Sequence, residues 1–307
     1  MSADFKHYSR QYFVALVLPL LIFCIPQNLY ANSFFWQAKS PTATVYLLGS
    51  IHFAKPDIYP LDRKIEDAFE KSSVLVVELD QKQLDQDNMR RHILKHGMYE
   101  KSDSVESHIS ESTLELLKDY LDRHDMPLEG YNRMKPGFLA MTLSIAHVIR
   151  LGYLPDYGID MYFLNKAQNK KVVQLENYAD QLDLFFDMPN EELFLKHTLI
   201  QFEDLEEQIA EMVTAWKNGD TQQMVENVLI EPQQEYPELR DIYTKIYTDR
   251  NIKMADKISQ FLEQKSIYFV VVGAGHLIGD QSIIQLLKKR GYKVKQYERS
   301  TVEIGDD

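Results

Sequence analysis

The fold of this 307-residue chain is decided by two stretches, VYLLGSIH at residues 45–52 and YFVVVGAGH at residues 268–276. Each is a continuous apolar run that ends in Gly-x-x-His, and each is followed by a helix-like segment and a second apolar run. Continuous apolar runs are typical of strands that are covered on both faces. The sequence therefore predicts a single α/β domain with a central sheet built from two units, each of them a strand, a Gly-x-x-His turn, a helix and a strand.

Much of the remaining sequence has the spacing of apolar residues that is typical of helices. We expect large helical insertions at about residues 84–150 and 180–264, which together form a cap over the sheet. The other predicted elements are helices at residues 61–71, 158–169 and 281–290 and strands at residues 74–77, 171–175 and 292–297.

Residues 1–31 have the pattern of an export signal. Lys6 and Arg10 give a basic start, residues 13–25 are apolar, and residues 29–31, Leu-Tyr-Ala, provide a cleavage site. The apolar run is shorter than the roughly 20 residues that a membrane-spanning helix needs. We therefore expect a signal peptide, a mature domain at residues 32–307 and a periplasmic or secreted protein that meets the membrane only during export. An uncleaved membrane anchor is the alternative.

The composition argues against several classes of protein. Hydrophobic residues make up 45% of the chain, which is enough for a sizeable core. Cys24 is the only cysteine and lies in the predicted signal, so the mature chain has neither a disulfide nor a thiol nucleophile. The formal net charge of -12 and the lack of a basic stripe argue against nucleic acid as a partner. The His-Glu-x-x-His, Gly-x-Ser-x-Gly and Walker motifs are absent.

The two histidines are the main candidates for chemistry. His52 and His276 follow predicted strands at equivalent places, and open α/β sheets bind ligands beyond the carboxyl ends of their strands. Glu78 ends the next strand of the first unit, and if that strand lies beside the one before His52, the carboxylate and His52 share the same edge of the sheet. Two histidines and one carboxylate commonly hold a catalytic divalent metal, which lowers the pKa of a bound water towards about 7. The structural alternatives are a hydrogen-bonding role for each histidine and a helix cap or arginine pair for Glu78.

Further polar residues are candidates for the same site. Glu176 ends the third predicted strand and is a candidate general base or additional metal ligand. Arg250 and Asn251 are candidates for binding a carboxylate or stabilising an oxyanion, whereas Asp160 is either a helix cap or part of a site loop. Glycine lets the backbone approach a ligand closely. The candidate substrate-binding residues are Gly49, Ser50, Asp160, Gly273 and Gly275.

Two other patterns compete with this interpretation. Gly273-x-Gly275-x-x-x-Gly279 follows a strand, and Glu298 lies about 20 residues further on, as in a dinucleotide-binding fingerprint. The second pattern is a pair of histidines, His92 and His96, whose spacing would allow them to chelate a metal on a helix. Their charged neighbours instead indicate a solvated helix face.

Taken together and in this order, the motifs resemble the TraB/PrgY/GumN family, whose animal relatives include the Tiki metalloproteases. The resemblance covers about residues 35–297. It rests on residues 46–52 (YLLGSIH), Pro60, Leu61, Ile65 and Ala68, residues 77–80 (VELD), 158–160 (GID), 173–176 (VQLE), Arg250 and Asn251, and residues 272–277 (VGAGHL) and 291–294 (GYKV).

The resemblance implies a metal-dependent hydrolase core. His52, Glu78 and His276 match the presumed catalytic residues of the Tiki branch, in which manganese or cobalt dependence is associated with peptide cleavage. We therefore expect an exported hydrolase, acting as a peptidase on a peptide or small-molecule substrate, with a divalent metal (Mn, Co or Zn) as its cofactor. A protein that binds a peptide or small ligand without turnover is the alternative from another class, and a dinucleotide-binding protein is a third.

Overall fold

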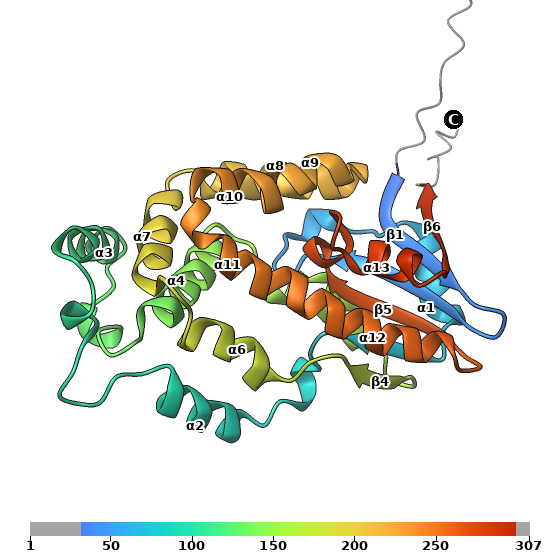
Figure 1. Ribbon diagram of the computed structural model, residues 1–307, viewed down its shortest axis with the longest axis horizontal. Coiled ribbons are helices and arrows are strands. Elements are labelled where there is room, and N and C mark those ends of the chain that lie inside the picture. Colours follow the sequence, from blue (N-terminus) through green and yellow to red (C-terminus); the bar gives the residue numbers. More distant parts are fainter. Residues whose placement is uncertain (1–31, 299–307) are drawn as a thin grey trace, which may run out of the picture.

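A six-stranded mixed sheet forms the centre of the protein, seen in a computed structural model that describes residues 32–298. The predicted signal peptide, with Cys24, lies outside the described residues. The strands follow the order β4-β3-β5-β2-β1-β6 across the sheet (Figure 1). Their bounds are β1 Asn32–Lys39, β2 Thr44–Ser50, β3 Val74–Val77, β4 Lys171–Gln174, β5 Ile267–Gly273 and β6 Lys293–Glu298.

Four neighbouring strands, β4, β3, β5 and β2, are parallel, whereas β1 pairs antiparallel with both β2 and β6. The predicted α/β class and single domain are thus confirmed. The strands before His52 and Glu78 are not direct neighbours, because β5 lies between β2 and β3. β5 is buried along almost its whole length and takes the central position, as expected for its continuous apolar run.

The two predicted units are not equivalent in space. In the first unit, β3 pairs with β5 on the parallel side of the sheet. In the second, β6 lies at the opposite edge, against β1. The burial of β6 is only partial and it carries Lys293 and Lys295, charges of the kind that protect an edge strand from pairing with another chain.

Different helices cover the two faces of the sheet. The ring of Phe269 in β5 lies 5.5 Å from that of Phe69 in α1 and 4.8 Å from that of Phe163 in α5. Neighbouring residues of a strand point to opposite faces, and Tyr268 accordingly stacks on Phe261 of α12 at 4.7 Å. α1 and α5 therefore cover one face, and α12, with α13 packed beside it, covers the other. The four helices are α1 Arg63–Lys71, α5 Ile159–Lys166, α12 Arg250–Leu262 and α13 Ile283–Lys289.

Capping side chains set where these helices begin. The carboxylate of Asp62 accepts the backbone N–H of Lys64 at 2.8 Å, so α1 begins after it and not at residue 61. The hydroxyl of Ser282 accepts the backbone N–H of Gln285 at 3.3 Å, so α13 begins two residues later than predicted. The predicted strand at residues 171–175 is present as β4.

The helical insertions form a lobe beside the sheet (Figure 1). This lobe has its own hydrophobic core, in which Leu117, Leu139, Leu143 and Leu195 are completely buried. Among residues 32–298, no helix is both long and apolar enough to span a membrane. The helices of the lobe are α2 Gln86–His96, α3 Glu111–Arg123, α4 Pro136–Arg150, α6 Tyr178–Phe186, α7 Glu191–Gln201, α8 Leu205–Asn218, α9 Thr221–Val225, α10 Glu231–Glu235 and α11 Arg240–Tyr243, with π-helical turns at Glu226–Ile230 and Thr244–Asp249.

Candidate active site

Most of the candidate residues meet at one edge of the sheet. His52 follows β2, Gly273 ends β5, Glu78 directly follows β3 and Glu176 follows β4. The carboxyl ends of these parallel strands lie side by side, which places the four residues in a row. Backbone hydrogen bonds extend the pairing past the strand ends, since the N–H of Glu176 donates to the carbonyl of Glu78 at 2.9 Å.

His52 is oriented by Asp160. The Nδ1 atom of His52 lies 2.8 Å from Oδ2 of Asp160, and the hydroxyl of Ser50 donates to the same oxygen. Asp160 is in the first turn of α5, which is fixed to the loop because the N–H of Ile159 donates to the carbonyl of Ile51 at 3.1 Å. The negative charge of Asp160 raises the pKa of His52 to about 9. Burial alone would raise the pKa of Asp160, but His52 and Ser50 lower it.

His276 is oriented by Asn251 at the start of α12. Its Nδ1 atom lies 2.7 Å from Oδ1 of Asn251, whose Nδ2 donates to the carbonyl of Gln281 at 3.0 Å. Because the amide nitrogen is used by that carbonyl, the amide oxygen faces His276, and Nδ1 of His276 carries the proton. Burial lowers the pKa of His276 to about 4, so the ring is neutral at pH 7 with a lone pair on Nε2.

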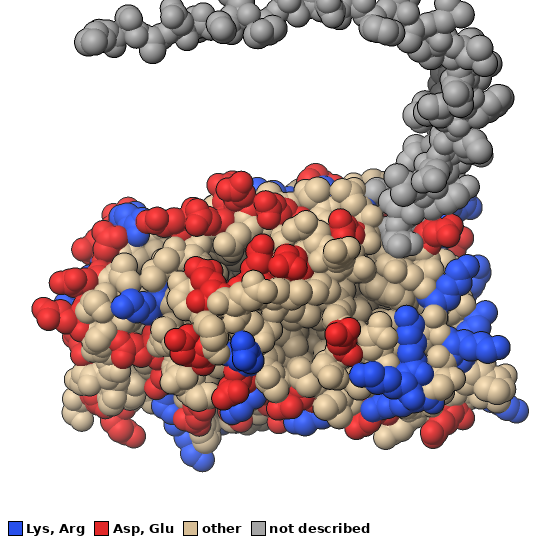
Figure 2. All heavy atoms as spheres, turned by 45° about the horizontal axis from the view of Figure 1, so that its top comes forward, with Lys and Arg blue, Asp and Glu red and all other residues tan. Residues whose placement is uncertain are grey.

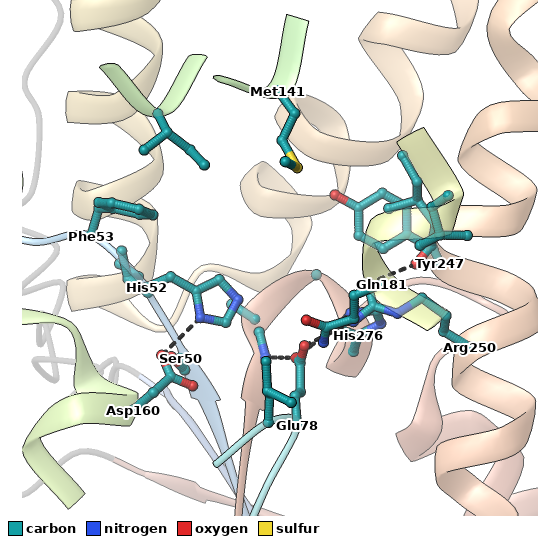
Figure 3. Close-up of a pocket in the computed structure, with 18 of the residues that line it drawn as sticks. Ser50, His52, Phe53, Glu78, Met141, Asp160, Gln181, Tyr247, Arg250 and His276 are labelled. Carbon is teal, nitrogen blue, oxygen red and sulfur yellow. Dashed lines mark hydrogen bonds and ion pairs between the residues drawn. The ribbon is translucent and has the colours of Figure 1, made fainter. Parts of the chain in front are cut away.

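The two imidazoles and Glu78 converge on Gly273. Figure 3 shows His52, Glu78 and His276 on the same side of the cavity. A Cβ atom at this glycine would lie 3.1 Å from Nε2 of His52, 3.3 Å from Oε1 of Glu78 and 3.5 Å from Cδ2 of His276. Two histidines more than two hundred residues apart in sequence are therefore neighbours, as the repeated motif predicts. The absence of a side chain at position 273 leaves the space between them open.

Glu78 links the histidines to Arg250. Its Oε1 accepts the N–H of Gly273 at 2.5 Å and lies 3.7 Å from Nε2 of His276, while its Oε2 accepts from Nη2 of Arg250 at 2.8 Å. Burial would raise the pKa of this carboxyl, but its interactions with His276, His52 and Arg250 and the hydrogen bond from Gly273 lower it. Glu78 is therefore ionised at neutral pH.

Glu176 is set back behind the guanidinium of Arg250. Both of its oxygens accept from Arg250, at 2.8 Å from Nε and 2.6 Å from Nη2, and Oε2 also accepts from Gln181 at 2.9 Å. A bidentate pair of this kind fixes the plane of the guanidinium. In this arrangement Glu176 holds Arg250 in place and does not itself face the histidines.

The candidate substrate-binding residues differ in their surroundings. Ser50, Asp160, Gly273 and Gly275 line the cavity above the site. Gly49 does not: its carbonyl accepts the indole N–H of Trp216 at 2.7 Å, and a Cβ here would lie 3.1 Å from the backbone of Ala274. Asp160 is hydrogen-bonded to Ser50 and His52, so its role in this arrangement is to orient His52.

A cavity of about 600 Å³ lies above these residues, between the sheet and the helical lobe. Its floor contains His52, Glu78 and His276, and its walls come from α2, α4, α6, α8, α9 and the π-helical turns. The side chain of His52 is 46% exposed, so the floor is accessible. Figure 3 shows Phe53 and Met141 on the side of the cavity opposite Glu78.

The nitrogen and oxygen donors at this site are of the kinds that bind a divalent cation, but in the described residues they are not arranged as a complete metal site. Among residues 32–298, no three His, Cys, Asp or Glu side chains are grouped so that they could hold a metal ion. Each histidine, however, has Nδ1 on an oxygen acceptor, which is how proteins orient metal-binding imidazoles. Nε2 of His276 is free of a proton at pH 7, whereas Nε2 of His52 would have to release its proton when a metal binds. Glu78 Oε1 would have to turn from the N–H of Gly273 to become a third ligand.

Two contributors to the site were not found from the sequence. Tyr247 lines the cavity, and its ring lies 5.6 Å from that of His276. Burial raises its pKa to about 12, so its hydroxyl stays protonated at neutral pH. Trp216 links α8 to the end of β2 through the hydrogen bond from its indole N–H to the carbonyl of Gly49. The sequence could have indicated Tyr247, because it lies three residues before Arg250 on a helical segment and residues at that spacing lie on one helix face.

The competing patterns fit the structure less well. Glu298 ends β6, which is separated from β5 by β2 and β1, so about 14 Å of sheet lies between them. The segment after Gly273 is a 3₁₀ turn, Ala274–Leu277, and α13 begins only at Ile283. His92, on α2, lies 2.7 Å from Asp183 of α6 and is outside the group around Gly273.

The sequence profile of the TraB/PrgY/gumN family matches residues 34–296, nearly the whole described chain. The chain belongs to this family. Similar proteins include an uncharacterized protein of Treponema pallidum, 24% identical over 90% of this chain and 89% of the relative. The uncharacterized protein YbaP of Escherichia coli is 26% identical over 84% of this chain and 94% of its own length, and YbaP of Shigella flexneri is 26% identical over 79% and 87%. No solved structure matches this chain.

Proposed function

We propose that this protein is a metal-dependent hydrolase that cleaves amide bonds in peptides. The observation that carries the proposal is the convergence of Nε2 of His52, the ring of His276 and Oε1 of Glu78 around Gly273. Nδ1 of each imidazole is held by an oxygen acceptor. Two imidazoles and one carboxylate form a donor set suited to Zn²⁺, Mn²⁺ or Co²⁺. The resemblance to the peptide-cleaving Tiki branch favours the same activity.

Each residue of the site has its own role in the proposed reaction. A divalent cation held by His52, His276 and Glu78 would lower the pKa of a water and polarise the substrate carbonyl. Arg250 lies beside Glu78 with its charge directed at the site, where it stabilises negative charge that develops on the carbonyl oxygen. Glu176 positions Arg250, and Asp160 and Asn251 hold the two rings.

Metal binding and peptide cleavage together test the proposal. The mature protein is freed of metal and titrated with Mn²⁺, Co²⁺ and Zn²⁺ by calorimetry, and a broad peptide library is then incubated with and without each ion. We expect one ion per chain and new peptide fragments only with metal, and neither in His52→Ala or His276→Ala. Equal metal binding by these variants would exclude the site, and binding without cleavage would exclude the activity.

A second function is favoured by the cavity itself. A volume of about 600 Å³ that is mostly apolar and roofed by helices is in the usual range for ligand pockets. A protein that sequesters a peptide or small ligand without turnover would need that cavity and no metal. Retention of an intact peptide by the metal-free protein, with no fragments after addition of any of the three ions, would select this function.

We also propose that the protein works outside the cytoplasm, in the periplasm or as a secreted protein. The support is the sequence of residues 1–31 alone, with its basic start, apolar run and Leu-Tyr-Ala at residues 29–31. Amino-terminal sequencing of the protein from the producing cell tests this, and a start at residue 32 is the expected result.

A further inference from the structure

We propose that the cavity above Gly273 is a subsite for large apolar side chains, so that the substrate is a peptide whose segment near the cleaved bond is apolar and uncharged. This inference rests on the proposed hydrolase function and specifies its substrate class. It is carried by the composition and the position of the cavity wall.

The wall of the cavity is apolar away from the floor. Four methionines from four different elements line it, together with branched and aromatic side chains; the methionines are Met89, Met141, Met212 and Met224. Methionine side chains are flexible and polarisable, and they adapt to apolar partners of different shape. A wall of this kind suits a series of apolar side chains better than one rigid ligand.

Charged groups in the lining are confined to the floor. The charged groups are His52, Glu78, Asp160 and Arg250; they lie beside the neutral imidazole of His276, and each of the five has a charged or polar partner within the site. A charged substrate group placed against the methionines would lose its water without gaining a partner, which is strongly unfavourable. The cavity therefore selects against Lys, Arg, Asp and Glu in the buried part of a substrate.

The opening of the cavity allows a longer chain to continue outside it. Ile145 of α4 lines the cavity and is 38% exposed, and the side chain of His52 on the floor is 46% exposed. A volume of about 600 Å³ holds a few residues of a peptide and not a folded domain. Figure 2 shows a hollow of uncharged residues with acidic side chains nearby.

The helix α4 offers a matched pair of variants. Ile145 lines the cavity, whereas Ile149, one turn later and 41% exposed, does not. Ile145→Asp places a charge at the apolar wall, and Ile149→Asp places the same charge on the same helix outside it. Both positions are partly solvated, so both variants are expected to fold. If Ile145→Asp does not fold, as judged by circular dichroism, Met141→Gln takes its place.

Binding is measured on metal-free protein with the uncharged apolar dye N-phenyl-1-naphthylamine. A neutral octapeptide with central Leu, Met and Phe should displace the dye, and an octapeptide with Lys and Glu at those positions should not. We expect Ile145→Asp to weaken dye and neutral-peptide binding by about tenfold, the loss of one apolar wall contact. Ile149→Asp should bind like the original protein.

The two proposals fail separately in this experiment. Equal displacement by the charged and neutral peptides, or equal binding by the two aspartate variants, overturns the apolar subsite. Selective binding of the neutral peptide that is followed by no cleavage with any metal leaves the subsite intact and excludes the hydrolase. Cleavage that prefers the neutral peptide and is lost in Ile145→Asp supports both.

Discussion

Asp160 and Asn251 are the residues through which the fold determines the direction of the two imidazoles. Both are buried, with 5% and 2% of their surface exposed, and each accepts from Nδ1 of one histidine. The motif Gly-x-x-His is visible in the sequence, but its partner acceptors come from distant helices. Asp160 was therefore a candidate for substrate binding, and its contact with His52 follows only from the packing of α5 on the loop after β2.

Asp160→Asn is expected to weaken the binding of Mn²⁺, Co²⁺ or Zn²⁺ by about 10- to 100-fold, because acceptors behind a metal-binding histidine contribute this much to affinity. Calorimetric titration of the metal-free variant measures the change. Asp156→Asn, an exposed change four residues earlier, is the control and should leave the affinity unaltered. An unchanged affinity in Asp160→Asn would show that this carboxylate does not support a metal-binding ring.

Gly273→Ala should abolish metal binding while the protein remains folded. The backbone here has φ -49° and ψ 137°, which an alanine adopts, but its methyl group would lie 3.1 Å from Nε2 of His52 and 3.3 Å from Oε1 of Glu78. Thermal unfolding checks the fold and calorimetry the metal. Gly130→Ala, where no atom lies within 4 Å of the new methyl, is the matched control. Normal metal binding by Gly273→Ala would place the cation elsewhere.

Among helices and strands, α12 does most to join the site to the fold. Its first residue, Arg250, bonds to Glu78 after β3 and to Glu176 after β4, and its second, Asn251, bonds to His276 after β5. One helix therefore ties together the ends of three parallel strands. The preceding segment, Thr244–Asp249, is π-helical, a local form that is frequent at functional sites.

Arg250→Met is expected to lower the free energy of unfolding by about 3–5 kcal/mol, because it leaves the buried carboxylates of Glu78 and Glu176 without their cation. Chemical denaturation measures the loss. The double variant Arg250→Met with Glu176→Gln should recover part of it, since one uncompensated charge is removed. Arg290→Met removes a more exposed pair with Asp256 and should cost about 1 kcal/mol or less. A similar cost at both arginines would contradict the buried network.

The elements that local sequence determines were predicted, and those that depend on packing were not. The apolar runs of β2, β3 and β5 and the short strand β4 are where the sequence places them. β1 was not predicted, although it separates β2 from β6. The insertion of β5 between β2 and β3 has no local signal either, because any order of parallel strands satisfies the same apolar pattern. The set His52, Glu78 and His276 was predicted because strand ends meet at one edge in any such order.

Across the whole molecule, the sheet and the helical lobe each have a hydrophobic core, and Trp216 of α8 and Met224 of α9 join that of the sheet. The cavity lies between the sheet and the lobe. The lobe contains two buried histidines that take no part in the site. His147 of α4 is bonded to the hydroxyl of Tyr120 at 3.1 Å, and His197 of α7 packs against Tyr236 with ring centroids 3.7 Å apart. Nε2 of His197 has no hydrogen-bond partner in the described part of the chain.

These histidines make the lobe sensitive to acid. Burial lowers the pKa of His147 and of His197 below the ordinary 6.5, so the unfolded chain takes up protons at a higher pH than the folded lobe does. Stability is unaffected by them above pH 6.5 and falls as the pH drops below it, until the folded rings also titrate. The lowered pKa values of the carboxyls Glu78 and Asp160 act in the same direction, but only below their ordinary values of 4.5 and 3.8. The window between pH 6.5 and 5 therefore reports on buried histidines.

His197→Phe should flatten the loss of stability in that window. Phenylalanine keeps the contact with Tyr236 and cannot take up a proton, so the variant should lose less unfolding free energy than the original protein between pH 7.5 and 5. Denaturant unfolding at the two pH values gives the difference, and hydrogen exchange locates it in α7. Ile200→Phe, at an exposed position of the same helix, introduces the same ring without removing an ionisable group and should follow the original protein. An identical pH dependence for His197→Phe and the original protein would mean that His197 is protonated as easily in the folded lobe as in the unfolded chain, which its burial opposes.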